Sequence, residues 1–269
     1  MWCFILASSP YIINEPTVIS FSGGRTSAFM LHQVLEANGG LPPHAYVTFA
    51  NTGKEHEETL KFVHACETNW AVKIYWLEYI LENPKFKEVD FETASRTGEP
   101  FDCLTTNRSY LPNPIARFCT SELKILTIDR FMKSQGIEEY DTMVGIRADE
   151  PRRGAKMRDS KLMPLFTSGV TQADIQTFWR SQSFDLGLYF RDSVTALGNC
   201  DLCFLKGINQ IQSIIHAEPE RAVWWAKQEE KIGGTFSKDR PSYRQMMEYS
   251  KSQLDMFGHQ ESIDCFCGD

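Results

Sequence analysis

The chain has 269 residues, of which 42% are hydrophobic and 23% are charged. This is the composition of a globular protein, and it excludes a disordered chain, a collagen-like fibre and a coiled coil. With 28 Lys and Arg residues against 35 Asp and Glu residues, the formal net charge is −7. An acidic balance argues against a broad basic surface for nucleic acid, so we expect direct nucleic-acid binding only where a partner supplies it.

The first residues carry no recognisable targeting signal. The apolar run over residues 2–7 lacks a basic leader and is too short to span a membrane. We therefore expect a cytoplasmic protein without membrane association. In that compartment the eight cysteines are expected to be thiols or metal ligands rather than disulfides.

Strand and helix patterns alternate along the first part of the chain. Runs of β-branched and apolar residues predict strands over residues 17–21, 45–50, 72–77 and 142–146. Apolar residues at helical spacing predict helices over residues 26–37, 55–70 and 122–135, and a further helix that begins at Thr171. This β-α-β-α-β order predicts a parallel sheet with right-handed crossovers.

Two segments depart from this alternation. Residues 81–118 are proline-rich and weakly periodic, and a connection of that length is usually a lid or a substrate loop. From Pro219 on, the pattern is helical and aromatic. We therefore expect a nucleotide-binding domain over residues 1–210 and a helical extension with a cysteine-containing tail over residues 211–269.

The sharpest local signal is the sequence SFSGGRTS at residues 20–27, where a buried strand runs through two glycines into a helix. Glycines let the backbone approach an anion, and the new helix points unpaired N–H groups at it. The spacing matches neither the Walker pattern nor the dinucleotide fingerprint. The candidate nucleotide-binding residues of this segment are Ser20, Ser22, Gly23, Gly24, Arg25, Thr26 and Ser27. A tight turn with Ser and Thr caps is the alternative.

The SGGxxS pattern resembles the pyrophosphate loop of the adenine-nucleotide α-hydrolase superfamily. The segment Asn51-Thr52-Gly53, followed by several glutamates, is similar to the second-strand segment of one branch, the phosphoadenosine phosphosulfate (PAPS) reductase family. The resemblance implies a doubly wound, mainly parallel five-stranded α/β sheet with both segments at the carboxyl ends of its strands. A plain turn is the alternative at residues 51–53.

A basic segment follows the fourth predicted strand. Arg147, Arg152 and Arg153 lie in it, and forked guanidinium groups suit phosphate or sulfate oxygens. The PAPS reductase family carries a similar Gly-x-Arg-x-x-Glu…Arg segment. The resemblance implies that these three arginines face the anionic groups of the nucleotide, with Arg147 taking part in catalysis. A solvated charged loop is the alternative.

Three cysteines form a candidate metal site. Cys119 precedes a predicted helix, and Cys200 and Cys203 have the spacing of zinc or iron–sulfur ligands. They resemble the iron–sulfur branch of the family, which holds a 4Fe–4S cluster with a tandem cysteine pair before a lysine-containing helix. Here that pair is Phe118-Cys119, so Cys265 or Cys267 is expected to supply the fourth ligand, with Cys103 as a further candidate. Zinc, or thiols without a metal, are the alternatives.

The tail allows a second interpretation. Cys267-Gly268 resembles the family's C-terminal nucleophile, although Phe266 replaces its acidic residue. Cys267 or Cys265 is therefore a candidate nucleophile as well as a candidate ligand.

Three functions follow from these observations. The first is reduction of a sulfonucleotide, PAPS or adenosine phosphosulfate (APS), with a thioredoxin-like reductant. The second is ATP-dependent adenylation, with Mg²⁺, followed by sulfur transfer from a donor to a nucleobase or nucleic acid. The third is a non-catalytic nucleotide-binding regulator whose cysteines hold structural zinc.

Overall fold

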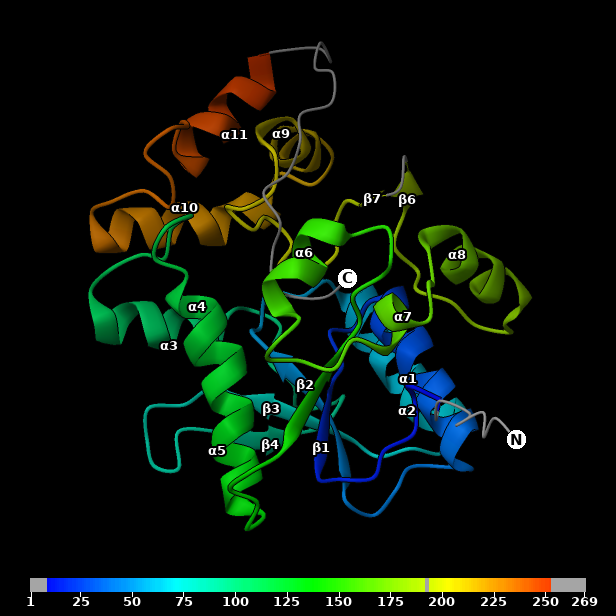
Figure 1. Ribbon diagram of the computed structural model, residues 1–269. Helices are drawn as coiled ribbons and strands as arrows, with labels where there is room; N and C mark the ends of the chain where they lie inside the picture. Colours follow the sequence, from blue (N-terminus) through cyan, green and yellow to red (C-terminus); the bar gives the residue numbers. More distant parts are fainter. Residues whose placement is uncertain (1–8, 192–193, 253–269) are drawn as a thin grey trace, which may run out of the picture.

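The computed structural model describes residues 9–191 and 194–252. Its main sheet has the order β4-β3-β2-β1-β5 (Figure 1). The strands are β1 (Thr17–Ser20), β2 (Ala45–Asn51), β3 (Ile74–Glu78), β4 (Lys87–Val89) and β5 (Asp141–Val144). Strand β4 is antiparallel to β3, and the other neighbours are parallel. The predicted mainly parallel, five-stranded α/β sheet is confirmed.

Helices flank and extend this sheet. They are α1 (Arg25–Asn38), α2 (Glu57–Asn69), α3 (Glu99–Arg108), α4 (Phe118–Thr120), the π-helix η1 (Ser121–Leu126), α5 (Thr127–Ser134), α6 (Pro151–Met157), α7 (Pro164–Thr167), α8 (Gln172–Ser181), α9 (Ile208–Ala217), α10 (Arg221–Ile232) and α11 (Tyr243–Ser252). A small antiparallel pair, β6 (Phe190–Arg191) and β7 (Val194–Thr195), follows α8. No helix within the described residues is long and apolar enough to cross a membrane.

The sheet is covered on both faces because alternate residues of each strand point to opposite sides. In β1, Ile19 packs on the face covered by α1, α2 and α8, whereas Val18 packs on the face covered by α5. Both residues are completely buried. This two-sided covering is what a doubly wound sheet requires.

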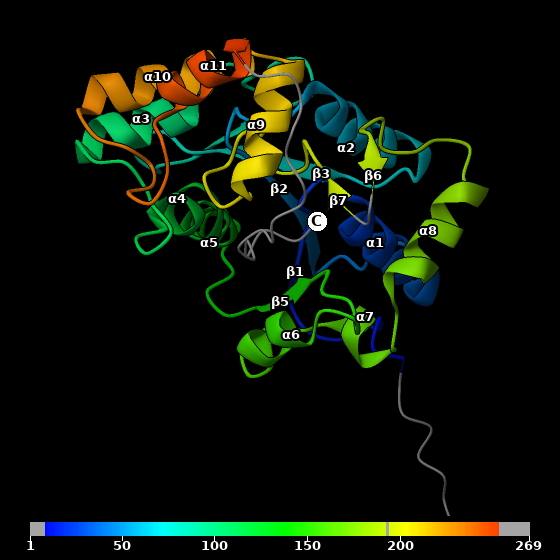
Figure 2. The same ribbon diagram turned by 90° about the horizontal axis from the view of Figure 1, so that it is seen from above.

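A second apolar core lies beside the sheet. It joins α3 and η1 to α9, α10 and α11, around Trp225, Phe236 and Tyr243 (Figures 1 and 2). The 81–118 segment contains β4 and α3, and Phe101 of α3 packs in this core. Part of the segment is therefore regular, packed structure. The core takes residues from both sides of the boundary we place at residue 210.

The strand order fixes where a ligand is expected. From β1 the chain proceeds through β2 and β3 to one side, and then returns to place β5 on the other side of β1. The point where this direction reverses lies between the carboxyl ends of β1 and β5, and open α/β sheets bind their ligands at such a point.

Candidate nucleotide site at the β1 and β5 strand ends

The loop after β1 is shaped by Gly23. Its φ angle is +81°, and a Cβ atom built there would lie 2.6 Å from Cγ2 of Thr59 and 3.2 Å from the ring of Phe49. Only glycine fits such a position without strain. The loop can therefore pass close to α2. Gly24 follows in extended conformation as the N-cap residue of α1.

One hydroxyl holds the two ends of this loop together. Ser27 Oγ accepts a hydrogen bond from the Ser22 backbone N–H at 3.2 Å and lies 2.9 Å from Ser22 Oγ. It also donates to the Gly24 carbonyl at 3.0 Å. Ser27 is 1% exposed, so it supports the loop from beneath while the first turn of α1 faces the pocket.

Arg147 closes the β5 side of the site. Its Nη1 donates to Thr26 Oγ1 at 3.2 Å, which places the guanidinium over the first turn of α1. Asp149 accepts from Nε at 2.9 Å, and a Glu150 oxygen lies 3.6 Å from Nη1. The cation is thus held at the strand-end crevice by two carboxylates of its own loop.

A pocket opens over this loop. Six predicted residues line it: Ser22, Gly23, Gly24, Arg25, Thr26 and Arg147. Eight residues that were not predicted also line it: Thr59, Gln172, Ile175, Gln176, Leu186, Thr195, Gly198 and Asn199. Ser20 ends β1 below the loop and is not among the lining residues. The helix N-terminus, backbone N–H groups and hydroxyls together suit an anionic ligand.

Arg25 lines this pocket but also acts as a tether. Its Nε lies 2.7 Å from Asp185 Oδ1 and its Nη2 lies 2.9 Å from Asp185 Oδ2, in a bidentate ion pair. Nη2 also donates to the Leu186 carbonyl at 2.7 Å. The guanidinium therefore fastens the segment after α8 to the phosphate loop.

The loop after β2 lies at the carboxyl end of its strand, as expected, but outside the lining of this pocket. Asn51, Thr52 and Gly53 are not among the residues that line the pocket. Asn51 Nδ2 donates to the buried Glu78 carboxylate at 2.6 Å and to the Ser95 carbonyl at 2.9 Å, and its Oδ1 accepts from Gly53. Thr52 donates to Glu55. These side chains are engaged with one another inside the protein.

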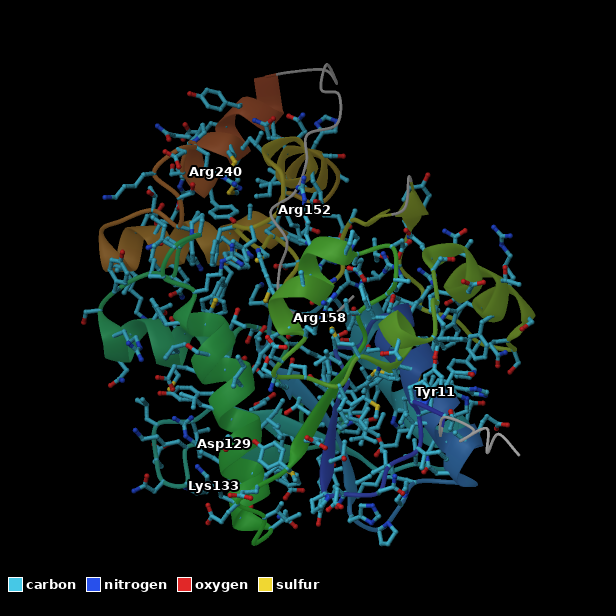
Figure 3. The ribbon with its side chains drawn as sticks, in the orientation of Figure 1. Tyr11, Asp129, Lys133, Arg152, Arg158 and Arg240 are labelled. Carbon is cyan, nitrogen blue, oxygen red and sulfur yellow. The ribbon has the colours of Figure 1, made fainter. Side chains whose placement is uncertain are left out.

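Two of the predicted arginines also lie away from the pocket lining. Arg153 is buried and its guanidinium contacts Glu150. Arg152 is exposed on α6, where Figure 3 shows it above Arg158. Arg147 is thus the one member of the predicted trio that reaches the lining of this pocket.

Three of the predicted cysteines belong to the second core or pack against it. Cys200 is buried, and its Sγ lies 3.4 Å from Thr52 Oγ1, whereas Cys119 and Cys203 are partly buried. Within residues 9–191 and 194–252, no group of three or more His, Cys, Asp or Glu side chains is arranged to hold a metal ion. The described thiols alone therefore do not fit a cluster. Cys265 and Cys267 lie outside the described residues, so the predicted four-ligand site stays a prediction.

Sequence reasoning missed Thr59 and Gln176. The helix that carries Gln176 was expected, and it begins with a capping box: the Asp174 carboxylate accepts from the Thr171 backbone N–H, and the Thr171 side chain accepts from the Asp174 backbone N–H. Its position next to the loop was not predictable from local pattern. Trp179 Nε1 donates to the Arg25 carbonyl at 3.0 Å, and this contact brings α8 against the start of α1.

Comparison with known proteins places this fold in a family. The model of the phosphoadenosine phosphosulfate reductase domain matches residues 16–183. The nin region protein ORF290 of Escherichia phage lambda is 30% identical over 204 residues, which cover 72% of this chain and 67% of that protein. A 37.8 kDa protein in the gpa 5′ region of Escherichia phage 186 is 26% identical, over 51% of this chain and 49% of its own length.

Two solved structures are distantly similar. PAPS reductase from Candida auris, in a phosphate complex, has 13% identity and a TM-score of 0.40, covering 66% of this chain and 81% of its own. The U34-tRNA thiolase NcsA from Methanococcus maripaludis, with its 4Fe–4S cluster, has the same identity and TM-score, covering 96% and 78%. The family model spans more than half of the chain, and the chain therefore belongs to the phosphoadenosine phosphosulfate reductase domain family.

Proposed function

We propose that the chain is an enzyme that binds the anionic end of an adenine nucleotide over the Ser22–Ser27 loop, for thiol-dependent reduction of a sulfonucleotide such as PAPS or APS. The observation that carries this proposal is the pocket itself. It joins the N-terminus of α1 to Arg147 at the point where the strand order reverses. Membership of the PAPS reductase domain family supports the same ligand class.

The reaction needs a nucleophilic thiol. No cysteine is among the described residues that line the pocket, so the proposal assigns this role to Cys267 or Cys265. The thiolate attacks the sulfur, the sulfur–oxygen bond to the nucleotide breaks, and the nucleoside phosphate leaves with the electron pair. A thioredoxin-like dithiol then attacks the cysteine sulfur of the thiosulfonate, releases sulfite and becomes a disulfide.

In this scheme the pocket residues stabilise the negative charge of the nucleotide and of the leaving phosphate. Arg147 would hold the anionic groups around the leaving phosphate, and the first turn of α1 would face them from the opposite side. Both contributions are fixed before the ligand arrives, because Arg147 is already oriented by Asp149 and Thr26.

A second function is favoured by one observation, the complete two-glycine loop with its Ser22–Ser27 clasp. Such a loop is suited to the pyrophosphate of ATP. The enzyme would then cleave ATP, with Mg²⁺, into pyrophosphate and an adenylated acceptor, and a sulfur donor would displace AMP. The acceptor class we propose is a nucleobase carbonyl, presented by a partner if it belongs to a nucleic acid.

One assay separates the two reactions. The full chain, purified without oxygen, is incubated either with PAPS or APS plus thioredoxin, or with ATP and Mg²⁺. Release of sulfite supports the reductase, whereas release of pyrophosphate without sulfite overturns it in favour of adenylation. If neither product forms while nucleotide binds, both reactions are overturned in favour of a nucleotide-binding regulator. Iron, sulfide and zinc analysis of the same sample tests the metal site proposed for Cys119, Cys200, Cys203 and a tail cysteine.

The variant Ser27→Ala links activity to the loop. It removes the hydroxyl that joins Ser22 to Gly24, and each lost hydrogen bond is worth about 1 kcal/mol. We expect nucleotide affinity to fall about tenfold, because the first turn of α1 loses its fixed position. Ser181→Ala is the matched control, since Ser181 is exposed and donates to the Phe178 carbonyl outside the pocket. Equal affinities for the two variants would contradict the assignment of this loop.

A further inference from the structure

Thr59 is a pocket residue that neither the sequence motifs nor the proposed reaction uses. It is the third residue of α2, it lines the nucleotide pocket and it is 2% exposed. Within the part of the chain that the structure describes, its Oγ1 is buried and has no hydrogen-bond partner. A buried hydroxyl without a partner costs about 1–3 kcal/mol, so its presence calls for an explanation.

Three other helical threonines of this chain show the usual way in which such a hydroxyl finds a partner. Their hydroxyls donate to the carbonyl four residues earlier, as in Thr68 to His64 at 2.8 Å, Thr105 to Phe101 at 3.2 Å and Thr177 to Ala173 at 2.9 Å. Thr59 has no such contact because the residue four positions earlier, Glu55, precedes the first turn of α2. Its place at the helix start leaves the hydroxyl available to something outside the helix.

The methyl group of Thr59 explains how the side chain is held. A Cβ atom at Gly23 would lie 2.6 Å from Thr59 Cγ2, so the methyl group packs directly against the first glycine of the phosphate loop. Rotation of the side chain is therefore restricted by the loop itself. Thr59 therefore lines the pocket from the α2 side of the loop, while Arg147 lines it from the β5 side.

We propose that Thr59 is a ligand-binding residue whose hydroxyl donates a hydrogen bond to an oxygen of the nucleotide's anionic chain. The inference rests on the proposed function, because it is the loop that brings the anion to this wall of the pocket. A bound anion supplies the acceptor that the ligand-free protein lacks. The hydroxyl thereby extends the anion site from α1 across to α2.

The structure offers a matched pair of variants. Thr59→Val keeps the shape of the side chain, including the methyl group against Gly23, and removes only the hydroxyl. Thr48→Val makes the same change in β2, where Thr48 is completely buried, has an Oγ1 without a partner among the described residues, and does not line the pocket. The two variants remove the same kind of buried hydroxyl, once inside and once outside the site.

Two measurements are made on the full-length wild type and both variants. The first is the melting temperature without ligand, and the second is affinity by calorimetry for inorganic pyrophosphate, APS and α,β-methylene-ATP. We expect both variants to melt about 2–4 °C higher, because an unsatisfied buried hydroxyl has been removed. Thr59→Val should bind the best probe about 10- to 100-fold more weakly, as expected for a lost hydrogen bond to a charged group. Thr48→Val should bind it as the wild type does.

A ligand-binding role predicts that Thr59→Val raises the melting temperature but lowers the affinity, and these opposite changes distinguish it from a structural role. A purely structural role for Thr59 would lower the melting temperature, and affinity within twofold of wild type would show that the hydroxyl does not contact the ligand; either result overturns the inference and leaves the proposed function intact. If the wild type binds none of the three probes, the proposed function and the inference both fail. Thr59→Ser, which keeps the hydroxyl but loses the methyl contact with Gly23, should retain affinity within about threefold while melting lower.

Discussion

The loops that follow β1 and β2 invite comparison. They end neighbouring parallel strands at the same edge of the sheet, and both combine hydroxyl or amide side chains with glycine. Both resemble nucleotide-binding segments of the same family. Yet residues 22–26 of the first loop line the pocket, whereas the loop over residues 51–53 is buried in contacts with the protein itself.

The difference lies in the neighbours of each loop. In the first loop, Ser27 and Ser22 satisfy each other, which leaves the backbone of the helix N-terminus facing the pocket. In the second, the carboxylates of Glu78 and Glu55 take the hydrogen bonds that Asn51 and Thr52 can donate. Of these two polar motifs, only the first therefore leaves hydrogen-bonding groups facing this pocket.

The largest effect is expected at Gly23, on which the first loop depends. Gly23→Ala forces a Cβ atom to within 2.6 Å of Thr59 and 3.2 Å of Phe49 at a φ of +81°. The left-handed backbone and the overpacking together should lower the free energy of unfolding by up to about 5 kcal/mol. Nucleotide affinity should fall beyond detection in calorimetry, because the loop must move away from α2.

Gly39→Ala is the control that measures the effect of the left-handed backbone without overpacking. Gly39 ends α1 at a φ of +65°, and a Cβ atom there would meet nothing within 4 Å. This variant should cost about 1 kcal/mol in urea unfolding and leave affinity unchanged. Equal losses at the two glycines would show that the contact with Thr59 and Phe49 does not shape the site.

The second largest effect is expected at Asn51. Asn51→Asp places a second carboxylate 2.6 Å from Glu78, which is completely buried and already paired with Lys87. Two carboxylates at this distance repel each other or force one to remain protonated, so we expect a loss of about 3 kcal/mol in urea unfolding. Because Asn51 does not line the pocket, nucleotide affinity measured below the unfolding transition should stay within about threefold.

An exposed asparagine provides the comparison. Asn69→Asp adds the same charge at the end of α2 and should cost less than about 1 kcal/mol. If Asn51→Asp instead abolished nucleotide binding while stability stayed near wild type, Asn51 would be a ligand-binding residue. The contrast between the two loops would then disappear.

The elements that the sequence predicted are those with a strong local pattern. Strands of four to seven residues with buried apolar runs, and the helices α1, α2 and α8, were found within a few positions of their observed ends, whereas the helix predicted over residues 122–135 is the π-helix η1 followed by α5. Strand β4 was missed because it has three residues at the sheet edge, two of them exposed and charged. Helix α3 was missed because Pro100 lies in its first turn and its apolar residues are few.

The same limit applies to the site. The Ser22–Ser27 loop is defined by residues next to one another in the chain, so its position and shape were predictable. The direction of Asn51 depends on Glu78, which is 27 residues away, and the role of Thr59 depends on Gly23, which belongs to another element. Contacts of this kind arise only when the sheet has brought the elements together.

The smallest effect is expected at His56, the N-cap residue of α2. Its Nδ1 accepts a hydrogen bond from the Glu58 backbone N–H at 3.0 Å, so the helix is capped only while this nitrogen carries no proton. Burial lowers the pKa of His56, and the nearby Arg221 lowers it further, against the opposite effects of Glu218, Glu58 and Asp201.

A lowered pKa in the folded state makes stability fall as the pH falls. Below about 6.5, the ordinary value for histidine, the unfolded chain takes up the proton first, and the loss continues until the pH passes the folded pKa of His56. His56→Asn keeps a capping side chain without this titration, so urea unfolding between pH 7 and pH 5 should show a shallower loss of stability than in the wild type. Part of the slope should remain, because burial also lowers the pKa of His32. His56→Ala, which loses the cap, should be less stable by about 1 kcal/mol at pH 7. A slope unchanged in His56→Asn would show that His56 contributes nothing to the acid sensitivity of the fold.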